Sequence, residues 1–484
     1  MYLQNLNLVI YLSVCQQPAT QSYTNPGLYA VKNSWNSISY NVYLRKPKLS
    51  SRKAEELIVS LKNTDNKITI DAPPSKSIYH RELIVRFLLG DAEHLNSISG
   101  DSDDVLATKA VLSALNAAAT GNLSPDSQGD VILPCNESGS TLRFMIPVAA
   151  AYLLGQGRRA DGVERLVFTT RGRLFDRPLD ELEAALSPHG ISIEKDIETR
   201  NIIVSGEMTP GTYTIDGSVS SQYISGLIMA LSLFTEKCAI EVTGTLKSVH
   251  YIELTEDVLK KYGCETIKDR NSYYPICNGY RREDGSMLID PSEDYNVEGD
   301  WSNGAFLLCL KKWTDMEVGN LKSDSRQGDR AIVDFLEKLQ AAETSDDKSL
   351  SYDCNDIPDI APYMAVTAAF TLDKAVFNGI SRLRIKESDR VAAVRDQLSA
   401  AGIITEETED SLTVYGQSDL PELQKEGNGH VANPLTLSSF HDHRMAMCAV
   451  LISAILGIKI ELDDIVCINK SFPQLIDYLD VENN

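Results

Sequence analysis

The sequence predicts an α/β protein of two similar domains, each built from three related units. The main observation is a sixfold pattern, in which a short cluster of Gly, Ser, Asp or Pro leads into a long, nearly all-apolar run. The copies begin near positions 73, 135, 216, 297, 356 and 440. Between them lie β-like segments such as LVFTT, NIIVSG and SLTVYG, and amphipathic helices such as RPLDELEAAL and DRAIVDFLEKLQ. Six such units in 484 residues indicate internal repetition.

The apolar runs predict helices that are buried on nearly all sides, so sheets and outer helices must surround them. The polar start of each helix offers free N–H groups and the positive end of the helix dipole, which favour anions. Any single start could be no more than an N-cap. If all six starts face one cleft, however, they create a strong anion site.

Composition and charge exclude several classes of function. The chain is 43% apolar and 24% charged, which is ordinary for a globular protein. Its net charge of −22 argues against a general nucleic-acid binder, although a local basic pocket is compatible with it. No apolar run is long enough to cross a bilayer. The nine scattered cysteines have neither a CxxC pair nor metal-ligand spacing, which favours reduced thiols in a cytoplasmic protein.

The first 64 residues differ from the rest of the chain. They are rich in Asn, Ser and Tyr, and their only clear pattern is a short amphipathic piece near SSRKAEELIVSLKN. We expect residues 1–64 to be a weakly ordered N-terminal extension that carries no chemistry.

Cations gather at or near the polar helix starts of this acidic chain. Guanidinium and ammonium groups suit phosphate and carboxylate oxygens, so the cluster indicates a ligand with several negative charges. A nucleotide P-loop is not supported, because GxxxxGK[ST] is absent. His441 and His443 have no third metal ligand nearby, and we expect one of them to orient an anion. The cations are Lys76, Arg81, Arg143, Arg177, Lys386, Arg390, Arg444 and Lys470.

Two carboxylates, Asp359 and Glu387, stand among these cations. As structural residues they would be an N-cap and an ion-pair partner. Beside substrate phosphates and lysines they are instead candidates for general acid–base catalysis, because neighbouring charges would shift their pKa values.

A set of short motifs, which together are specific, resembles the EPSP synthase family, the 3-phosphoshikimate 1-carboxyvinyltransferases. The resemblance covers about Ile68 to Leu479 and implies the enolpyruvyl transferase fold, with two domains of three βαβαββ units each. When the domain boundaries of the family are transferred to this sequence, one domain spans residues 75–295, and the other combines residues 296–484 with a strand at 67–74. The motifs, in family order, are SKSxxxR, SGSTLR, DRP, DGSVSSQ, IPD, RIKESDR, DHRMAMC and KSFP.

The resemblance also implies a reaction. The enolpyruvyl group of phosphoenolpyruvate would be transferred to the 5-hydroxyl of shikimate 3-phosphate, releasing phosphate, in aromatic amino acid (chorismate) biosynthesis. No metal or organic cofactor is implied. The expected partners are the two small-molecule substrates, without nucleic acid or membrane, and we expect a monomer.

The matching positions imply roles for individual residues. Lys76, Asp359 and Glu387 would move protons, with Asp359 as the base near the reacting hydroxyl. The residues implied to bind shikimate 3-phosphate are Lys76, Ser77, Arg81, Ser220, Ser221, Gln222, Ser248, Asp359 and Lys386, with Tyr251 close by. Those implied to bind phosphoenolpyruvate are Lys76, Gly139, Arg177, Gln222, Arg390, Arg444 and Lys470.

Two positions depart from the family pattern. Glu137 stands where the family often has Asn, and we expect its carboxylate to turn away from the substrate, either capping the following helix or pairing with a cation such as Arg143. Pro74 stands where glycine commonly precedes SKS. The alternatives are the sister enolpyruvyl transferase acting on UDP-N-acetylglucosamine, which uses a reactive cysteine on a mobile loop, and a binding paralogue that has lost catalysis.

Overall fold

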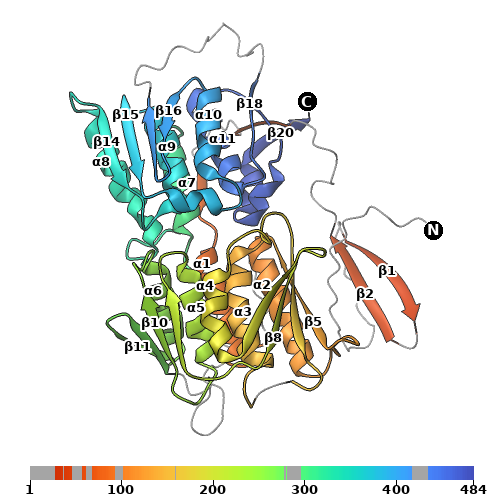
Figure 1. The fold of residues 1–484 in the computed structure, drawn as a ribbon. Helices are drawn as coiled ribbons and strands as arrows, with labels where there is room; N and C mark the ends of the chain where they lie inside the picture. The colour runs from red at the N-terminus through yellow and green to blue at the C-terminus, as the bar shows by residue number, and fades with distance from the viewer. Residues whose placement is uncertain are drawn as a thin grey trace. The chain divides into compact units, whose positions relative to one another are not determined.

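The computed structural model describes residues 28–35, 38–45, 57–61, 68–92, 102–157, 160–276, 280, 296–416 and 434–483. It divides into two units, residues 1–55 and 56–484. The described part of the first unit is an antiparallel hairpin of β1 (Leu28–Trp35) and β2 (Ile38–Arg45) (Figure 1). The remainder of the predicted weakly ordered extension up to residue 56 lies outside the described residues.

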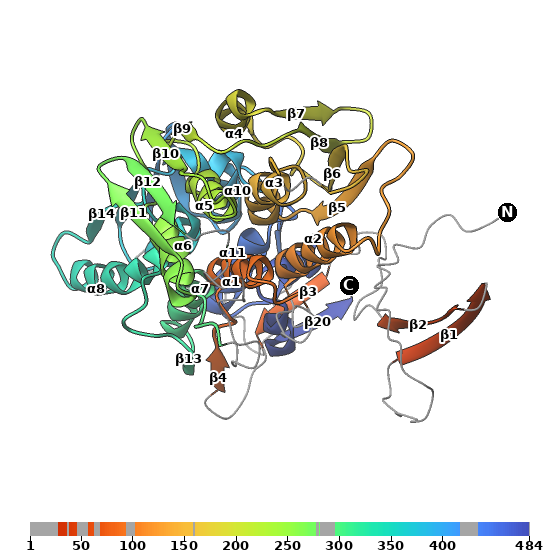
Figure 2. The same cartoon turned by 90° about the horizontal axis from the view of Figure 1, so that it is seen from below.

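In the second unit, four sheets share one strand order: a parallel pair followed by two antiparallel strands (Figures 1 and 2). In three of them the chain order is strand, helix, strand, helix, strand, strand, and the helical crossover allows the first pair to be parallel. These three are β5 (Asp130–Asn136), β6 (Arg165–Thr170), β8 (Asn201–Gly206) and β7 (Ile191–Asp196); β9 (Thr212–Asp216), β10 (Ala239–Thr243), β12 (Ser272–Ile276) and β11 (Glu265–Asp269); and β14 (Ser349–Asp353), β15 (Lys374–Asn378), β17 (Ser411–Tyr415) and β16 (Ile404–Glu407).

The fourth sheet corrects the predicted boundary of the N-terminal extension. Its order is β18 (Leu435–Leu437), β19 (Ile460–Leu462), β3 (Leu57–Leu61) and β20 (Leu479–Asn483). Strand β3 is antiparallel to both neighbours, and Val59 at its centre is fully buried. The prediction of an extension reaching residue 64 is therefore wrong for residues 57–61. A strand-forming run such as LIVSL is paired here by segments about 400 residues further along the chain.

Among the described residues, two adjacent segments lead from one region of the second unit to another. Strand β4 (Ile68–Asp71) is parallel to β13 (Met316–Gly319), and a bridge between Pro74 and Gly299 follows. Ser75 N donates to Glu298 O at 2.7 Å, and Asp300 N donates to Pro73 O at 2.8 Å. Pro74 thus lies where the chain leaves β4, beside the segment that returns to β13.

The buried apolar side chains form two clusters. One comes from residues 79–297, which we call the first lobe. The other comes from residues 59–72 and 301–479, which we call the second lobe. The division of the chain into folding domains at residues 75–295 and 296–484 stays a prediction.

All six predicted apolar helices are present, and most of their residues are buried. A helix that buries nearly every side satisfies its backbone internally, so it can fill the centre of an α/β lobe. The α/β fold class is confirmed, and no described helix has the length and apolarity to span a membrane. The six are α1 (Lys76–Leu88), α3 (Gly139–Leu153), α5 (Ser221–Leu231), α7 (Trp301–Lys311), α9 (Ala361–Ala369) and α11 (His443–Leu456).

The other helices lie between the apolar ones along the chain. The two predicted amphipathic helices correspond to α4 and α8. The set comprises α2 (Asp103–Ala119), α4 (Asp180–Leu186), α6 (His250–Lys261), α8 (Ile332–Glu343) and α10 (Arg390–Ala400).

Candidate functional site

One pocket receives the starts of all six apolar helices, so the condition under which they would form a strong anion site is met. Five of these helices have an N-terminal residue in its lining, and α9 is represented by the turn directly before it, η5 (Pro358–Ile360). The residues contributed by the six starts are Lys76 and Ser77, Gly139 and Ser140, Ser220 and Ser221, Asp300 and Ser302, Pro358 and Asp359, and His443 and Arg444.

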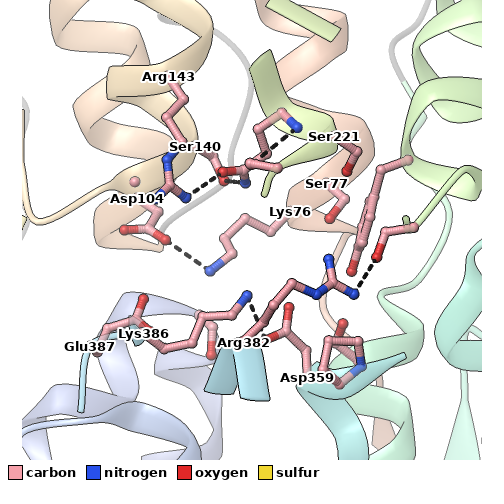
Figure 3. A pocket seen from close by; sticks show the side chains of 18 of the residues that line it. Lys76, Ser77, Asp104, Ser140, Arg143, Ser221, Asp359, Arg382, Lys386 and Glu387 are labelled. Atoms are coloured by element: carbon pink, nitrogen blue, oxygen red, sulfur yellow. Dashed lines mark hydrogen bonds and ion pairs between the residues drawn. The ribbon is translucent and has the colours of Figure 1, made fainter. Parts of the chain in front are cut away.

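The structure brings the site residues predicted from the sequence into this one place (Figure 3). Every one of them except Lys470 lines the pocket. Lys470 lies directly beside it, with its Nζ 3.4 Å from Glu387 Oε1. Both lobes therefore contribute to the pocket, and their contributions differ in the way that charge is arranged.

On the second-lobe side, Arg390 is the centre of a charge network. Its guanidinium group is 2% exposed and contacts three carboxylates at once. It lies 2.8 Å from Asp442, 2.9 Å from Asp359 and 2.6 Å from Glu387. Three acceptors match the planar fork of an arginine and leave little freedom to any of the partners.

Asp359 is held as an ionised carboxylate. Burial alone would raise its pKa, but nearby cations outweigh the burial and hold the pKa far below its usual range. Lys386 Nζ lies 3.2 Å from its Oδ1, an ion pair that Figure 3 shows. An ionised carboxylate at the pocket wall can accept a hydrogen bond from a bound hydroxyl. The cations are Lys386, Arg444 and Arg390.

Glu387 is also ionised. Burial opposes ionisation, yet the charges of Arg177, Lys470 and Arg390 hold its pKa well below the ordinary value. Arg177 Nη2 lies 3.0 Å from its Oε1. Since Arg177 belongs to the first lobe, this ion pair links the two sides of the pocket.

On the first-lobe side, most charged groups contact neutral oxygens. Arg143 donates to Gln222 Oε1 at 2.9 Å, and Gln222 in turn donates to Ser140 Oγ at 2.9 Å. Arg81 is buried among Thr255 Oγ1, at 2.7 Å, and the Tyr251 carbonyl, at 2.8 Å. This burial lowers the pKa of Arg81 to about 9.

Lys76, like Arg177, pairs with a carboxylate instead. Its Nζ lies 2.8 Å from Asp104 Oδ2, as Figure 3 shows. Burial would raise the pKa of Asp104, but the charges of Lys76 and Lys470 lower it below the ordinary value.

Four guanidinium groups in the pocket wall have no carboxylate partner. Arg382 donates to Ser248 Oγ at 3.0 Å and to the carbonyl of Asn355, and the Nε of Arg444 is buried without a hydrogen bond in the part of the chain that the structure describes. Arg81 and Arg143 contact only neutral partners. Within the described residues, none of the four makes an ion pair, so their positive charge is available to a ligand.

Glu137 lies beside a cation, as expected, but the cation is Lys470 and not Arg143. The side chain that caps α3 is Ser138, whose Oγ accepts from Thr141 N at 3.3 Å, and Arg143 turns to Gln222 instead. Glu137 lies 3.6 Å from Lys470 Nζ, with its side chain 49% exposed. The helix-capping alternative is therefore wrong, and the pairing with a cation is confirmed, with Lys470 in place of the suggested Arg143.

The two histidines lie in different surroundings, and the expectation that one of them orients an anion stays a prediction. His443 is buried in the pocket lining, and burial holds its pKa well below 6.5, so its ring is neutral. His441 is 80% exposed and pairs with Asp464 at 3.0 Å. In the described part of the chain, no cluster of His, Cys, Asp and Glu is arranged to hold a metal ion, and the seven described cysteines are free thiols.

Several pocket residues were missed by sequence reasoning. Asp104 follows the N-cap of α2 in the string DSDD, and Asp300 caps α7 through Asn303 N at 2.8 Å. An acidic residue at a helix start was a usable signal for both. Arg382 lies in the short turn η6 (Ser381–Ile385), where nothing local distinguishes it from a surface arginine.

An α/β fold with a pocket ringed by helix starts and unpaired guanidinium groups defines a class of protein that binds small, multiply charged anions. The model of the family EPSP synthase (3-phosphoshikimate 1-carboxyvinyltransferase) matches residues 62–479. The chain is 32% identical to the 3-phosphoshikimate 1-carboxyvinyltransferase of Clostridioides difficile, over 86% of this chain and 95% of the relative. It is 33% identical to that of Clostridium beijerinckii, over 84% and 93%. The chain belongs to the EPSP synthase family.

The fold also resembles that of a solved EPSP synthase. A solved EPSP synthase from Acinetobacter baumannii superposes with a TM-score of 0.59 over 88% of this chain and 100% of that chain, at 17% identity. At that identity the superposition shows the shared fold alone.

Proposed function

We propose that this protein transfers the enolpyruvyl group of phosphoenolpyruvate to the 5-hydroxyl of shikimate 3-phosphate, giving 5-enolpyruvylshikimate 3-phosphate and phosphate. The observation that carries the proposal is that guanidinium groups without an ion pair among the described residues line the same pocket as the ionised carboxylate of Asp359. Two substrates that each carry a phosphate and a carboxylate need such cations, and an attacking hydroxyl needs a base.

The proposed sites of the two substrates follow the two sides of the pocket. Shikimate 3-phosphate lies against the hydroxyl-rich first-lobe side, with Lys386 and Asp359 on its ring. Phosphoenolpyruvate lies between the lobes, where Arg177 and Lys470 meet Glu387. The residues proposed for the first substrate are Lys76, Ser77, Arg81, Ser220, Ser221, Gln222, Ser248, Asp359 and Lys386, and those for the second are Lys76, Gly139, Arg177, Gln222, Arg390, Arg444 and Lys470.

In the proposed mechanism, Asp359 accepts the proton of the 5-hydroxyl as its oxygen attacks the enol carbon next to the methylene group. The methylene carbon gains a proton at the same stage, and Lys76 and Glu387 are the candidate donors. Glu387 is ionised, so it must take up a proton before it can donate one. The surrounding guanidinium groups stabilise the charge of the tetrahedral intermediate. The group that donated the proton then takes one back from the new methyl group as phosphate leaves, which restores the carbon–carbon double bond of the enolpyruvyl product.

The test is phosphate release from phosphoenolpyruvate by the purified protein, with shikimate 3-phosphate present or omitted. Release should require shikimate 3-phosphate, and mass spectrometry should find the enolpyruvyl product. UDP-N-acetylglucosamine serves as the rival acceptor. Activity with that acceptor alone would contradict the proposal in favour of the sister transferase.

The binding-paralogue alternative predicts a different result: shikimate 3-phosphate binds in calorimetry, yet no phosphate is released under any condition. The proposed residues favour catalysis over this alternative, because Lys76, Asp359 and Glu387 all meet at the pocket. We further propose that the protein acts as a cytoplasmic monomer, which sedimentation velocity would test.

A further inference from the structure

A buried carboxyl group lies behind the pocket wall and has no part in the proposed mechanism. Ser302, in the first turn of α7, lines the pocket, and its Oγ is hydrogen-bonded to Oδ2 of Asp329. Asp329 lies in the turn η4 (Gly328–Ala331) and is 3% exposed. Its other oxygen, Oδ1, is buried without a hydrogen-bond partner among the described residues.

The surroundings of Asp329 include three charged groups, Asp300, Asp359 and Arg444, and the phenol of Tyr251, which stays neutral because burial raises its pKa well above 10. Asp300 precedes α7, Asp359 lies in η5, Tyr251 lies in α6 and Arg444 lies in α11. Burial, reinforced by the negative charge of Asp359, raises the pKa of Asp329 to about 6, although Arg444 opposes the rise. Asp329 therefore gains or loses its proton in a pH range where enzymes operate.

The protonation state of Asp329 determines whether the Ser302 hydroxyl can donate a hydrogen bond into the pocket. A carboxylate only accepts hydrogen bonds, so the single O–H of Ser302 must point to it, and only oxygen lone pairs face the pocket. A carboxylic acid donates its own O–H to Ser302 Oγ. The hydrogen of Ser302 is then free to point into the pocket.

We propose that Ser302 and Asp329 form a proton-dependent hydrogen-bond donor for the substrate anion held beside the start of α7. The inference rests on the proposed function only in requiring an anion in this pocket. Lys76, which donates its backbone N–H to Asp300 at 3.0 Å, and Arg444 flank this part of the lining and supply the positive charge. Asp329 acts through Ser302 and is therefore a positioning residue.

The test measures sulfate binding by isothermal titration calorimetry at pH 5.5 and pH 7.5. Sulfate stays a dianion over this range, so a change in affinity comes from the protein. The wild-type protein should bind sulfate about tenfold more weakly at the higher pH, which is the effect of one hydrogen bond to a charged group.

Two variants distinguish the effect of the Ser302 hydroxyl on sulfate binding from the effect of the Asp329 charge. Asp329→Asn can donate an amide N–H to Ser302 permanently, so it should bind sulfate at pH 7.5 about as tightly as the wild-type protein does at pH 5.5. Ser302→Ala keeps the charge of Asp329 but removes the hydroxyl, so most of the pH dependence should disappear. If Ser302→Ala keeps the full dependence, Asp329 acts by charge alone and the proposal is wrong.

Thermal unfolding shows whether both variants are folded. If Asp329→Asn does not fold, the pH dependence of sulfate binding by Ser302→Ala is sufficient to test the proposal. The results distinguish a failure of this inference from a failure of the proposed function. The expected sulfate pattern without carboxyvinyl transfer would overturn only the proposed reaction, whereas transfer with identical sulfate pH dependence in all three proteins would overturn only this inference.

Discussion

In the first lobe, Arg81 and Arg143 contact hydroxyl, amide and carbonyl oxygens, whereas in the second lobe Arg390 contacts three carboxylates. Neutral partners fix the first-lobe guanidinium groups in place without cancelling their charge. Carboxylate partners cancel the charge of Arg390, but they in turn remain ionised inside the protein. The first-lobe arginines therefore keep their positive charge available to an anion, whereas the Arg390 network fixes two pocket carboxylates, Asp359 and Glu387, in their ionised form.

The difference also has an energetic consequence. Removing one member of the Arg390 network leaves its partner as a buried charge without a counter-ion. This lowers the free energy of unfolding by about 3–5 kcal/mol. A first-lobe arginine with neutral partners carries no such penalty for its neighbours. We thus expect substitutions in the second lobe to affect stability and turnover together, and those in the first lobe to affect substrate binding.

The largest expected effect tests whether the second lobe depends on the N-terminal strand β3. Deleting residues 1–64 removes β3 from between β19 and β20, exposes two strand edges and should give insoluble or inactive protein. Deleting residues 1–55 keeps β3 and should leave activity within about threefold. Solubility and phosphate release of the two truncations are compared. Equal activity in both would show that β3 is dispensable.

The second prediction removes the proposed base from the second-lobe network. Asp359→Ala should lower turnover by roughly two to four orders of magnitude, the range for loss of a general base. Shikimate 3-phosphate should still bind, more weakly. Asp373→Ala is the matched control, because Asp373 is an exposed aspartate beyond the end of α9. Near-normal turnover in folded Asp359→Ala protein would remove Asp359 from the proposed role.

The third prediction concerns Asp329, a second-lobe carboxyl without an ion pair in the described residues. Its pKa is about 6 in the folded protein and 3.8 in the reference state, so folding favours the protonated form. The contribution of Asp329 to stability is therefore largest below pH 4 and falls by about 3 kcal/mol as the pH rises through 6. Asp329→Asn cannot ionise and should gain thermal stability relative to the wild-type protein over that window.

Circular dichroism melts at pH 4, 5, 6 and 7 measure this difference. A gap between the two melting temperatures that stays constant with pH would mean that Asp329 ionises normally in the folded protein. It would then be ionised from pH 4 to 7, as Asp359 and Glu387 are, and the contrast between these ion-paired carboxylates and Asp329 would not hold.

The contrast between the lobes also marks what the sequence could predict. The six helix starts were predictable because a polar cap followed by an apolar run is a local signal. The pairing of β3 with β19 and β20 was not, because it joins segments about 400 residues apart and no local period encodes the partner. Arg382 was missed for the same reason, since only the fold brings its guanidinium group to Ser248.

The smallest expected effect is at Glu137, which shares Lys470 with Glu387 across the two lobes. A half-exposed ion pair at 3.6 Å contributes about 0–1 kcal/mol, so losing it should hardly change the melting temperature. Replacing the carboxylate by the neutral amide in Glu137→Asn leaves more of the Lys470 charge to an anionic substrate. We therefore expect the Michaelis constant for phosphoenolpyruvate to fall about two- to fivefold, which corresponds to less than 1 kcal/mol.

Glu198→Asn is the matched control, because Glu198 is exposed in the turn between β7 and β8 and does not line the pocket. Steady-state kinetics at low and high salt complete the test, since screening should weaken the effect of an exposed carboxylate. An unchanged or higher Michaelis constant in Glu137→Asn would mean that Lys470 is held by Glu387 alone. A fall of tenfold or more that persists at high salt would instead place the Glu137 carboxylate in direct contact with the substrate.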